Sequence, residues 1–253
     1  MTRVISFANQ KGGVAKTTTT FELGEVLAKY YDKRVLMIDL DPQASLTIIK
    51  YDVEKVAANK EKTVDRVMLE KCGLDDVIVN LKNNLDLAPA TLKLSDSELN
   101  ITNTMSREFI LKDALDKVKD NYDFVLIDCP PARGILTVNA LVASDDVIIP
   151  VQAEYQALLG VQLLKNTIKQ VKHKINKGLN VLGFVITMTT HTNHSNEIIE
   201  SIYNDELDVI GTIPRSIDVA DAAVANVSTY EYRKDNAAGM AYYELAKTLI
   251  GGK

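Results

Sequence analysis

The most constraining feature of this chain is a glycine-containing segment near its start. Residues 9–18 read Asn-Gln-Lys-Gly-Gly-Val-Ala-Lys-Thr-Thr and follow directly on the apolar run 4–8. A buried strand that runs into a glycine pair and then into a helix aims backbone N–H groups and a helix N-terminus at a triphosphate. The pattern predicts a phosphate-binding loop, in which Lys16 reaches the β- and γ-phosphates and the Thr17 hydroxyl binds Mg²⁺.

A second lysine stands in the same loop. Lys11 precedes Lys16 on the other side of the glycine pair, and a simple phosphate-binding loop has no need of it. We interpret Lys11 as the mark of a variant in which one subunit reaches into the nucleotide of its partner.

The composition is typical of a globular protein. The 253 residues are 46% apolar and 25% charged, and this length allows one substantial core, so we expect a single domain over residues 1–253. No apolar stretch approaches the ~20 residues of a membrane span. The first predicted strand begins too early for a signal peptide, and we therefore expect a cytoplasmic protein without a membrane partner. Cys72 and Cys129 are too few for a disulfide framework and are expected to be reduced.

Charge is unevenly distributed along the chain. The formal net charge of −5 argues against a protein coated in nucleic acid through its overall field. Between Glu154 and Glu197 there is nevertheless no acidic residue, while five lysines and all three histidines fall in that stretch. A basic region is therefore expected inside an acidic protein.

Short apolar runs alternate with helical patterns from end to end. Strands are predicted at residues 4–8, 34–40, 85–88, 124–128, 147–151, 181–187 and 209–213. Strands that are apolar on both faces and separated by helices predict an α/β fold: a single doubly wound domain with a mostly parallel central sheet flanked by helices. Residues 50–84 are the least regular part. They are expected to form a surface insertion with a short helix at 63–69.

Two helices show informative faces. In the first, Leu164, Ile168, Val171 and Ile175 recur at helical spacing and predict a buried stripe, which leaves a set of lysines pointing outward. The second spans 237–250 and is expected to close the core. Its predicted apolar face consists of Met240, Tyr243, Leu245, Ala246, Leu249 and Ile250.

Carboxylates follow two of the predicted strands. Asp39 and Asp41 stand at the end of the second strand, and Asp128 ends the run 124–128. Ligands bind at the carboxyl ends of strands in open α/β sheets. Asp128 has the pattern of a Walker-B acid that holds Mg²⁺ directly or through water, and the other two acids are candidates for metal-shell and water-positioning roles. A strand-end Asp can also be a simple turn former or helix cap, but three of them around one phosphate loop favour a functional site.

These motifs together resemble the ParA/Soj group of the deviant Walker-A ATPases. The resemblance covers nearly the whole chain. It is carried by residues 11–18 (Lys-Gly-Gly-Val-Ala-Lys-Thr-Thr), 39–43 (Asp-Leu-Asp-Pro-Gln) and 128–131 (Asp-Cys-Pro-Pro), and it continues at 149–155, 211–215 and 241–247.

The resemblance implies a bacterial, cytoplasmic and nucleoid-associated ATPase. Such an enzyme forms a face-to-face homodimer around two ATP–Mg²⁺ units and binds double-stranded DNA non-specifically in that form. A ParB-type centromere-binding protein stimulates its weak turnover, and loss of the γ-phosphate releases the dimer and the DNA.

The resemblance also implies roles for individual residues. Catalysis falls to Lys11, which contacts the nucleotide of the partner, to Lys16, and to Asp41, which orients or activates the attacking water. Thr17, Asp39 and Asp128 support the metal. The implied nucleotide-binding set is Lys11, Gly12, Gly13, Val14, Ala15, Lys16, Thr17, Thr18 and Pro214.

Two positions depart from the pattern of the family. Ala15 stands where glycine is usual, and if that position needs a positive φ, the methyl group costs about 1–2 kcal/mol. His191 lies where relatives commonly carry an arginine that touches DNA, and a mostly neutral imidazole is a weaker phosphate contact. Other cations must then contribute more to DNA binding.

Candidates for DNA contact are therefore drawn from the remaining cations. Neither an interleaved aromatic residue nor a recognition-helix motif is evident, so we expect binding without sequence preference. The candidates are Lys165, Lys169, Lys172, Arg215, Arg233, Lys234 and Lys247.

Other functions share parts of this pattern. A MinD-like ATPase that cycles on membranes would have the same phosphate loop, although the last helix lacks the flanking cations of a membrane-surface helix. An iron–sulfur carrier would need a second suitably placed cysteine beside Cys129. A DNA tether without turnover would have little reason to keep Lys16, Thr17, Asp41 and Asp128.

Overall fold

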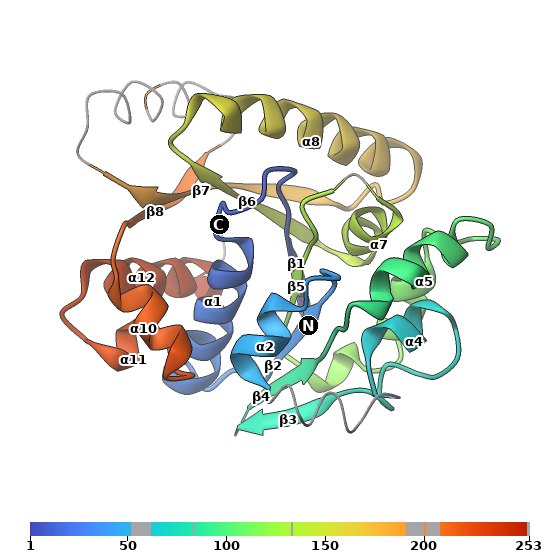
Figure 1. Ribbon diagram of the computed structural model, residues 1–253, viewed down its shortest axis with the longest axis horizontal. Helices are drawn as coiled ribbons and strands as arrows, with labels where there is room; N and C mark the ends of the chain where they lie inside the picture. Colours follow the sequence, from blue (N-terminus) through green and yellow to red (C-terminus); the bar gives the residue numbers. More distant parts are fainter. Residues whose placement is uncertain (52–61, 83, 133, 191–199, 201–207, 252–253) are drawn as a thin grey trace.

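The chain forms an eight-stranded sheet in the order β3-β4-β2-β5-β1-β6-β7-β8 (Figure 1). The computed structural model describes residues 1–51, 62–82, 84–132, 134–190, 200 and 208–251, without the side chains of 155–159. The strands are β1 (Arg3–Phe7), β2 (Val35–Asp39), β3 (Val79–Lys82), β4 (Leu85–Ala88), β5 (Phe124–Asp128), β6 (Asp146–Gln152), β7 (Asn180–Thr189) and β8 (Val209–Pro214). The helices are α1 (Lys16–Tyr30), α2 (Ser45–Lys50), α4 (Val64–Met68), α5 (Lys93–Ile101), α6 (Ile110–Leu115), α7 (Ile135–Ala143), α8 (Tyr155–Lys174), α10 (Asp218–Val224), α11 (Thr229–Tyr232) and α12 (Ala237–Gly251), with a 3₁₀ turn at Lys119–Asn121.

The chain leaves the centre of the sheet in two directions. Strand β1 lies between β5 and β6. From β1 the chain runs to β2 and β4 on one side, returns as β5, and continues through β6, β7 and β8 on the other side. The described pairings are parallel except for β3 with β4. Ligands of such sheets bind beyond the carboxyl ends of the strands where the winding reverses, which here is the loop after β1.

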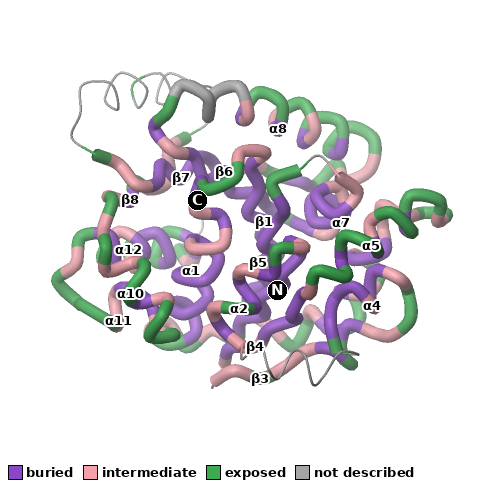
Figure 2. Tube along the Cα trace, viewed as in Figure 1, coloured by how far each residue is buried: buried purple, intermediate pink, exposed green. Residues whose placement is uncertain are grey.

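Two apolar layers cover the sheet, one on each face, and the central strands β1, β5 and β6 are largely buried (Figure 2). Consecutive side chains of β2 alternate between them, since Leu36 and Ile38 join one cluster and Met37 joins the other. Helices α4 to α8 pack on the first face, and α1 and α12 pack on the second. The strands at the centre are buried on both sides, as their continuous apolar runs predict.

The fold confirms the predicted α/β class, with one correction. All seven predicted strands form within two residues of their expected ends. The antiparallel edge strand β3 was not predicted, because an alternation of four half-buried residues is a weak signal. The expectation of a surface insertion at 50–84 is wrong in two places: β3 joins the sheet, and Val64, Val67 and Met68 of the predicted short helix are buried in the core. Residues 52–61 lie outside the described part.

The two predicted helix faces are largely as expected. In α8, Leu164, Ile168 and Val171 are buried. In α12 the buried face is not the predicted one at two positions. Met240, predicted to be buried, is 40% exposed, whereas Tyr242, which was not predicted, is only 1% exposed. Among the described helices, none is long and apolar enough to cross a bilayer.

Helix α1 buries two carboxylates against the elements around it. Glu25 forms ion pairs with Lys50 at the end of α2 and with Lys82 of β3. Glu22 accepts hydrogen bonds from the backbone N–H of Thr229 at 2.9 Å and from its hydroxyl at 2.6 Å, which fixes the start of α11. These contacts tie the C-terminal helices to α1, the helix that follows the phosphate-binding loop.

Glu22 makes stability depend on pH. Burial raises the pKa of Glu22 from 4.5 to about 7, against the hydrogen bonds from Thr229. Because the pKa of Glu22 is higher in the folded than in the unfolded protein, its protonated form stabilises the fold. This contribution is fully present below the pKa of the unfolded state and is lost as pH rises through the pKa of the folded state. Between pH 4.5 and 7 we expect the wild type to lose up to about 3 kcal/mol of unfolding free energy relative to Glu22→Gln. Urea unfolding at both pH values measures this difference, and identical pH dependence in the two proteins would contradict it.

Candidate nucleotide-binding site

The start of the phosphate-binding loop is pinned to the neighbouring strand. Buried Asn9 donates from Nδ2 to the carbonyl of Pro150 in β6 at 2.7 Å, and its Oδ1 accepts the backbone N–H of Lys11 at 3.0 Å. Helix α8 approaches the same point, since a Cβ placed on Gly160 would lie 3.4 Å from Asn9 Oδ1 and 3.7 Å from the Lys11 nitrogen. The loop therefore leaves β1 in a defined direction.

The middle of the loop turns sharply to expose its glycines. Gly13 has φ 75° and Ala15 has φ 65°, both in the left-handed region. Val14 between them is buried, and its carbonyl accepts the Thr187 hydroxyl of β7 at 3.1 Å. Ala15 thus meets the condition under which its methyl group is costly, because the left-handed conformation disfavours any residue with a Cβ.

Lys16 opens α1 and lies inside the loop. Its side chain is buried, and Nζ donates to the carbonyl of Lys11 at 3.2 Å. Burial lowers the pKa of Lys16, and the nearby charges of Asp128 and Asp41 oppose that shift. The ammonium group is therefore held by the loop backbone in the field of two carboxylates, an arrangement compatible with the expected role of Lys16 at the β- and γ-phosphates.

Asp128 at the end of β5 carries an unsatisfied oxygen. Its Oδ2 accepts the Thr17 hydroxyl at 2.6 Å. Its Oδ1 is buried and has no hydrogen-bond partner among the described residues. Burial raises the pKa of Asp128 well above its ordinary value, and the adjacent Asp39 adds to the effect. An orphaned carboxylate oxygen beside a threonine hydroxyl fits a Mg²⁺ site.

Asp39 faces Asp128 across paired strands but has a different environment. Its carboxylate accepts the Thr47 backbone N–H at 2.8 Å, the Thr47 hydroxyl at 2.7 Å and the Asp41 backbone N–H at 3.2 Å. Burial raises the pKa of Asp39 despite these bonds. Asp39 therefore anchors α2 and the turn that carries Asp41, which is 8% exposed and accepts the Gln43 N–H at 2.9 Å.

Protein side chains alone do not form a metal cage here. In the described part of the chain, no three His, Cys, Asp or Glu side chains are grouped to hold a metal ion. Mg²⁺ usually keeps several waters and binds through one or two carboxylates together with substrate phosphates. The pair of Thr17 and Asp128 beside the loop meets that requirement.

The side chain of Lys11, the second lysine of the loop, makes its contact within its own chain. Its Nζ forms an ion pair with Glu154, which precedes α8. The Lys11 side chain is 21% exposed and that of Glu154 is 51% exposed, so the pair lies at the rim of the site. Thr18 follows in the first turn of α1, and Pro214 ends β8 half-buried.

The predicted DNA-contact residues fall on both faces of the sheet. Lys165, Lys169 and Lys172 lie on α8, whereas Arg233, Lys234 and Lys247 lie in or beside α11 and α12 on the opposite face (Figure 1). Arg215 is exposed directly after β8. Arg233 pairs with Asp218 at 2.9 Å, and Lys247 lies 3.7 Å from Glu244. His191 lies outside the described residues.

Several residues that build the site were not assigned a role from the sequence. Asn9, Thr47 and Thr187 are single polar residues in or beside apolar runs, and their function depends on contacts with distant strands. Glu154 belongs to the 149–155 segment that carries the family resemblance. Position within that segment was the only signal that could have singled it out.

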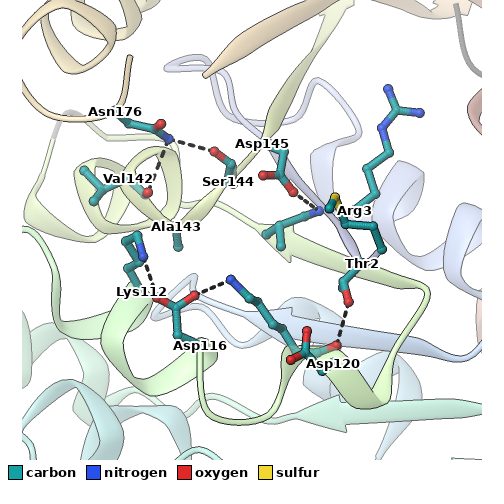
Figure 3. A pocket seen from close by; sticks show the side chains of 13 residues that line it. Thr2, Arg3, Lys112, Asp116, Asp120, Val142, Ala143, Ser144, Asp145 and Asn176 are labelled. Carbon is teal, nitrogen blue, oxygen red and sulfur yellow. Dashed lines mark hydrogen bonds and ion pairs between the residues drawn. The ribbon is translucent and has the colours of Figure 1, made fainter. Parts of the chain in front are cut away.

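A separate cavity of about 610 Å³ lies at the amino ends of the strands, away from the loop after β1 (Figure 3). Several of its charged groups are already engaged in ion pairs or in hydrogen bonds to the backbone. Asp116 pairs with Lys112 and, at 2.5 Å, with Lys119, and Asp145 accepts the Val4 N–H at 2.8 Å. This cavity offers neither the glycine loop nor the unsatisfied carboxylate of the other edge.

The loop after β1, its buried lysine and the threonine–aspartate pair define a P-loop nucleoside triphosphatase of doubly wound α/β fold. Residues 2–181 match a family described as an AAA domain. The chain is 40% identical to the sporulation initiation inhibitor protein Soj of Bacillus subtilis, over 98% of both chains. It is 36% identical to the chromosome partitioning protein ParA of Caulobacter vibrioides, over 98% of this chain and 94% of that one. The chain belongs to the ParA/Soj family of partition ATPases.

Solved structures share this fold. A putative plasmid partition protein from Borrelia burgdorferi bound to AMPPNP superposes with a TM-score of 0.85 at 26% identity, covering 99% of both chains. A Mycobacterium smegmatis protein named cobyrinic acid a,c-diamide synthase, with bound ADP and magnesium, also gives 0.85, at 35% identity over 99% of this chain and 94% of that one. Both neighbours therefore hold an adenine nucleotide on this fold.

The strained backbone at Ala15 can be tested directly. Ala15→Gly relieves about 1–2 kcal/mol of left-handed strain and adds a smaller entropy cost in the unfolded chain, so we expect a net gain of roughly 0.5–1 kcal/mol. Ala225, which caps α10 with φ −74°, serves as the matched control. Ala225→Gly relieves no strain and should destabilise. Urea unfolding measures both, and a destabilised Ala15→Gly protein would show that the loop does not need glycine there.

Proposed function

We propose that this partition ATPase works as an ATP-dependent homodimer. In this proposal the dimer binds duplex DNA without sequence preference, and a ParB-type partner releases it by stimulating hydrolysis. The proposal places the protein on the nucleoid in the bacterial cytoplasm. The observation that carries the enzymatic part is the meeting of buried Lys16 with Thr17 and the unsatisfied Asp128 oxygen at one loop.

The proposed chemistry follows from these positions. The backbone N–H groups of the loop and Lys16 neutralise the β- and γ-phosphates of ATP, because phosphoryl transfer depends mainly on positioning and charge stabilisation. Thr17 and Asp128 hold Mg²⁺, which when bound shields the phosphate oxygens. Asp41 orients the attacking water from the turn after β2.

The turn that carries Asp41 is well placed to sense the γ-phosphate. It is hydrogen-bonded to Asp39 on one side and leads into α2, whose Lys50 is buried against Glu25 of α1. Loss of the γ-phosphate removes the interaction that holds this turn, and the helices tied to it then relax. Hydrolysis therefore acts as a timer for assembly.

DNA binding is proposed to centre on α8. Lys169 and Lys172 are exposed there, and no acidic residue interrupts the sequence between Glu154 and Glu197. On the opposite face, acidic neighbours partly neutralise Arg233 and Lys247. Arg215 and Lys165 extend the α8 set, and dimerisation doubles it.

Trapping the ATP state tests the catalytic proposal. Asp41→Ala removes the group that orients water while leaving the phosphate contacts, so ATP–Mg²⁺ should drive it into a stable dimer without turnover. Lys16→Ala is the control: it should lose productive nucleotide binding and remain monomeric. Light scattering and phosphate release measure both, and normal hydrolysis by Asp41→Ala would remove Asp41 from the mechanism.

Paired neutralisations test the DNA surface. In the Asp41→Ala background with ATP, Lys169→Gln with Lys172→Gln should weaken binding to random duplex DNA. The slope of log affinity against log salt should fall by about 0.9 for each DNA phosphate that the protein no longer neutralises. Arg233→Gln with Lys234→Gln removes the same charge from the opposite face and should change the slope less. If no state of the parent protein binds DNA but ATP drives it onto anionic vesicles, a MinD-like membrane cycle replaces the DNA proposal.

A further inference from the structure

We propose that Glu154 is a positioning residue that holds Lys11 on its own subunit until the nucleotide of a second subunit competes for it. The inference rests on the proposed role of Lys11 across the dimer. It assigns to the Lys11–Glu154 ion pair the function of a latch, meaning a contact that must open before the dimer can close.

The backbone of Lys11 is held by hydrogen bonds within the loop, whereas its ammonium group is held by the ion pair with Glu154 at the solvated rim. Its N–H is held by Asn9 Oδ1 at 3.0 Å, and its carbonyl accepts Lys16 Nζ at 3.2 Å. The side chain has four rotatable methylene groups and is partly exposed. Opening the latch thus needs only a rotamer change of Lys11.

Glu154 is also fixed at its base. It caps α8 in an extended conformation, and its N–H donates to the Gln152 carbonyl at 2.7 Å. Helix α8 comes close to Lys11, because a Cβ on Gly160 would lie 3.8 Å from Lys11 Cβ. The carboxylate is consequently presented to Lys11 by the element that carries the proposed DNA-binding lysines.

The strength of the pair suits a reversible contact. An ion pair at a solvated rim contributes about 0.2–1 kcal/mol, which is too little to block assembly. A triphosphate carries several negative charges and competes easily with one carboxylate for the same ammonium. The latch therefore lowers dimer affinity by a small factor and disappears when a charged nucleotide is presented by the partner.

A double-mutant cycle in the hydrolysis-blocked background tests this role. Asp41→Ala protein with saturating ATP–Mg²⁺ is compared with versions that add Glu154→Gln, Lys11→Ala or both, and the dimer dissociation constant is measured by sedimentation. We expect Glu154→Gln to tighten the dimer about two- to five-fold and to have no effect when Lys11→Ala is present. An equal effect without the lysine, or a weaker dimer, would overturn the latch.

A second measurement covers the case in which Lys11→Ala does not dimerise. In the ADP-bound monomer with an intact Lys11, Glu154→Gln should raise the rate at which an acylating reagent labels Lys11, as quantified by mass spectrometry. Lys247, whose neighbour is Glu244, is the internal control and should not change. If Glu154→Gln leaves the labelling rate of Lys11 unchanged, the proposal that Glu154 holds Lys11 is wrong.

The two proposals fail in different ways. If the Asp41→Ala protein stays monomeric with ATP while Lys11 labelling rises in Glu154→Gln, the ion pair exists but the dimer does not, and the proposed function fails together with the latch. If the parent dimerises and Glu154→Gln leaves its dissociation constant unchanged, the latch alone fails.

Discussion

Two carboxylates buried side by side constrain the whole nucleotide-binding edge. Asp39 and Asp128 end adjacent paired strands and are both fully buried. Burial raises the pKa of each carboxyl group, and the charge of Asp39 raises that of Asp128 further. The surrounding elements respond differently to each. Asp39 is surrounded by donors from α2 and its preceding turn, whereas Asp128 receives Thr17 and the field of Lys16 and keeps one oxygen open. This asymmetry favours Asp128 as the metal-facing acid and Asp39 as the anchor of the turn that carries Asp41.

The same asymmetry shows what a sequence can predict. Both aspartates could be placed at the carboxyl edge, because each follows a continuous apolar run and parallel strands end at the same edge. Their separate roles depend on Thr47 and Thr17, which approach from other elements. Local patterns give the position of a side chain along a strand, but its partners come from the tertiary fold.

Other limits have equally specific causes. The conformation of residue 15 is dictated by the loop rather than by alanine, so the sequence supplied only the condition that a positive φ would be costly. The burial of Tyr242 rather than Met240 depends on how α12 meets α1. The cations at 165–172 and 233–247 are both candidates for DNA contact, and the sequence could not say whether they share a surface. Their elements cover opposite faces of the sheet, and helical periodicity carries no information about which face a helix covers.

The two lysines of the phosphate loop divide their work by burial. Lys16 is buried within its own loop and lies in the field of Asp128 and Asp41, which suits the proposed role toward the nucleotide of its own subunit. Lys11 stands at the rim with its backbone fixed and its side chain partly exposed, where it has the freedom to act on a second subunit. A lysine at the rim without an acidic partner would also be able to bind phosphate groups non-specifically. In the proposed dimer, the ion pair with Glu154 holds the lysine at small energetic cost and gives way when the partner presents a more highly charged anion.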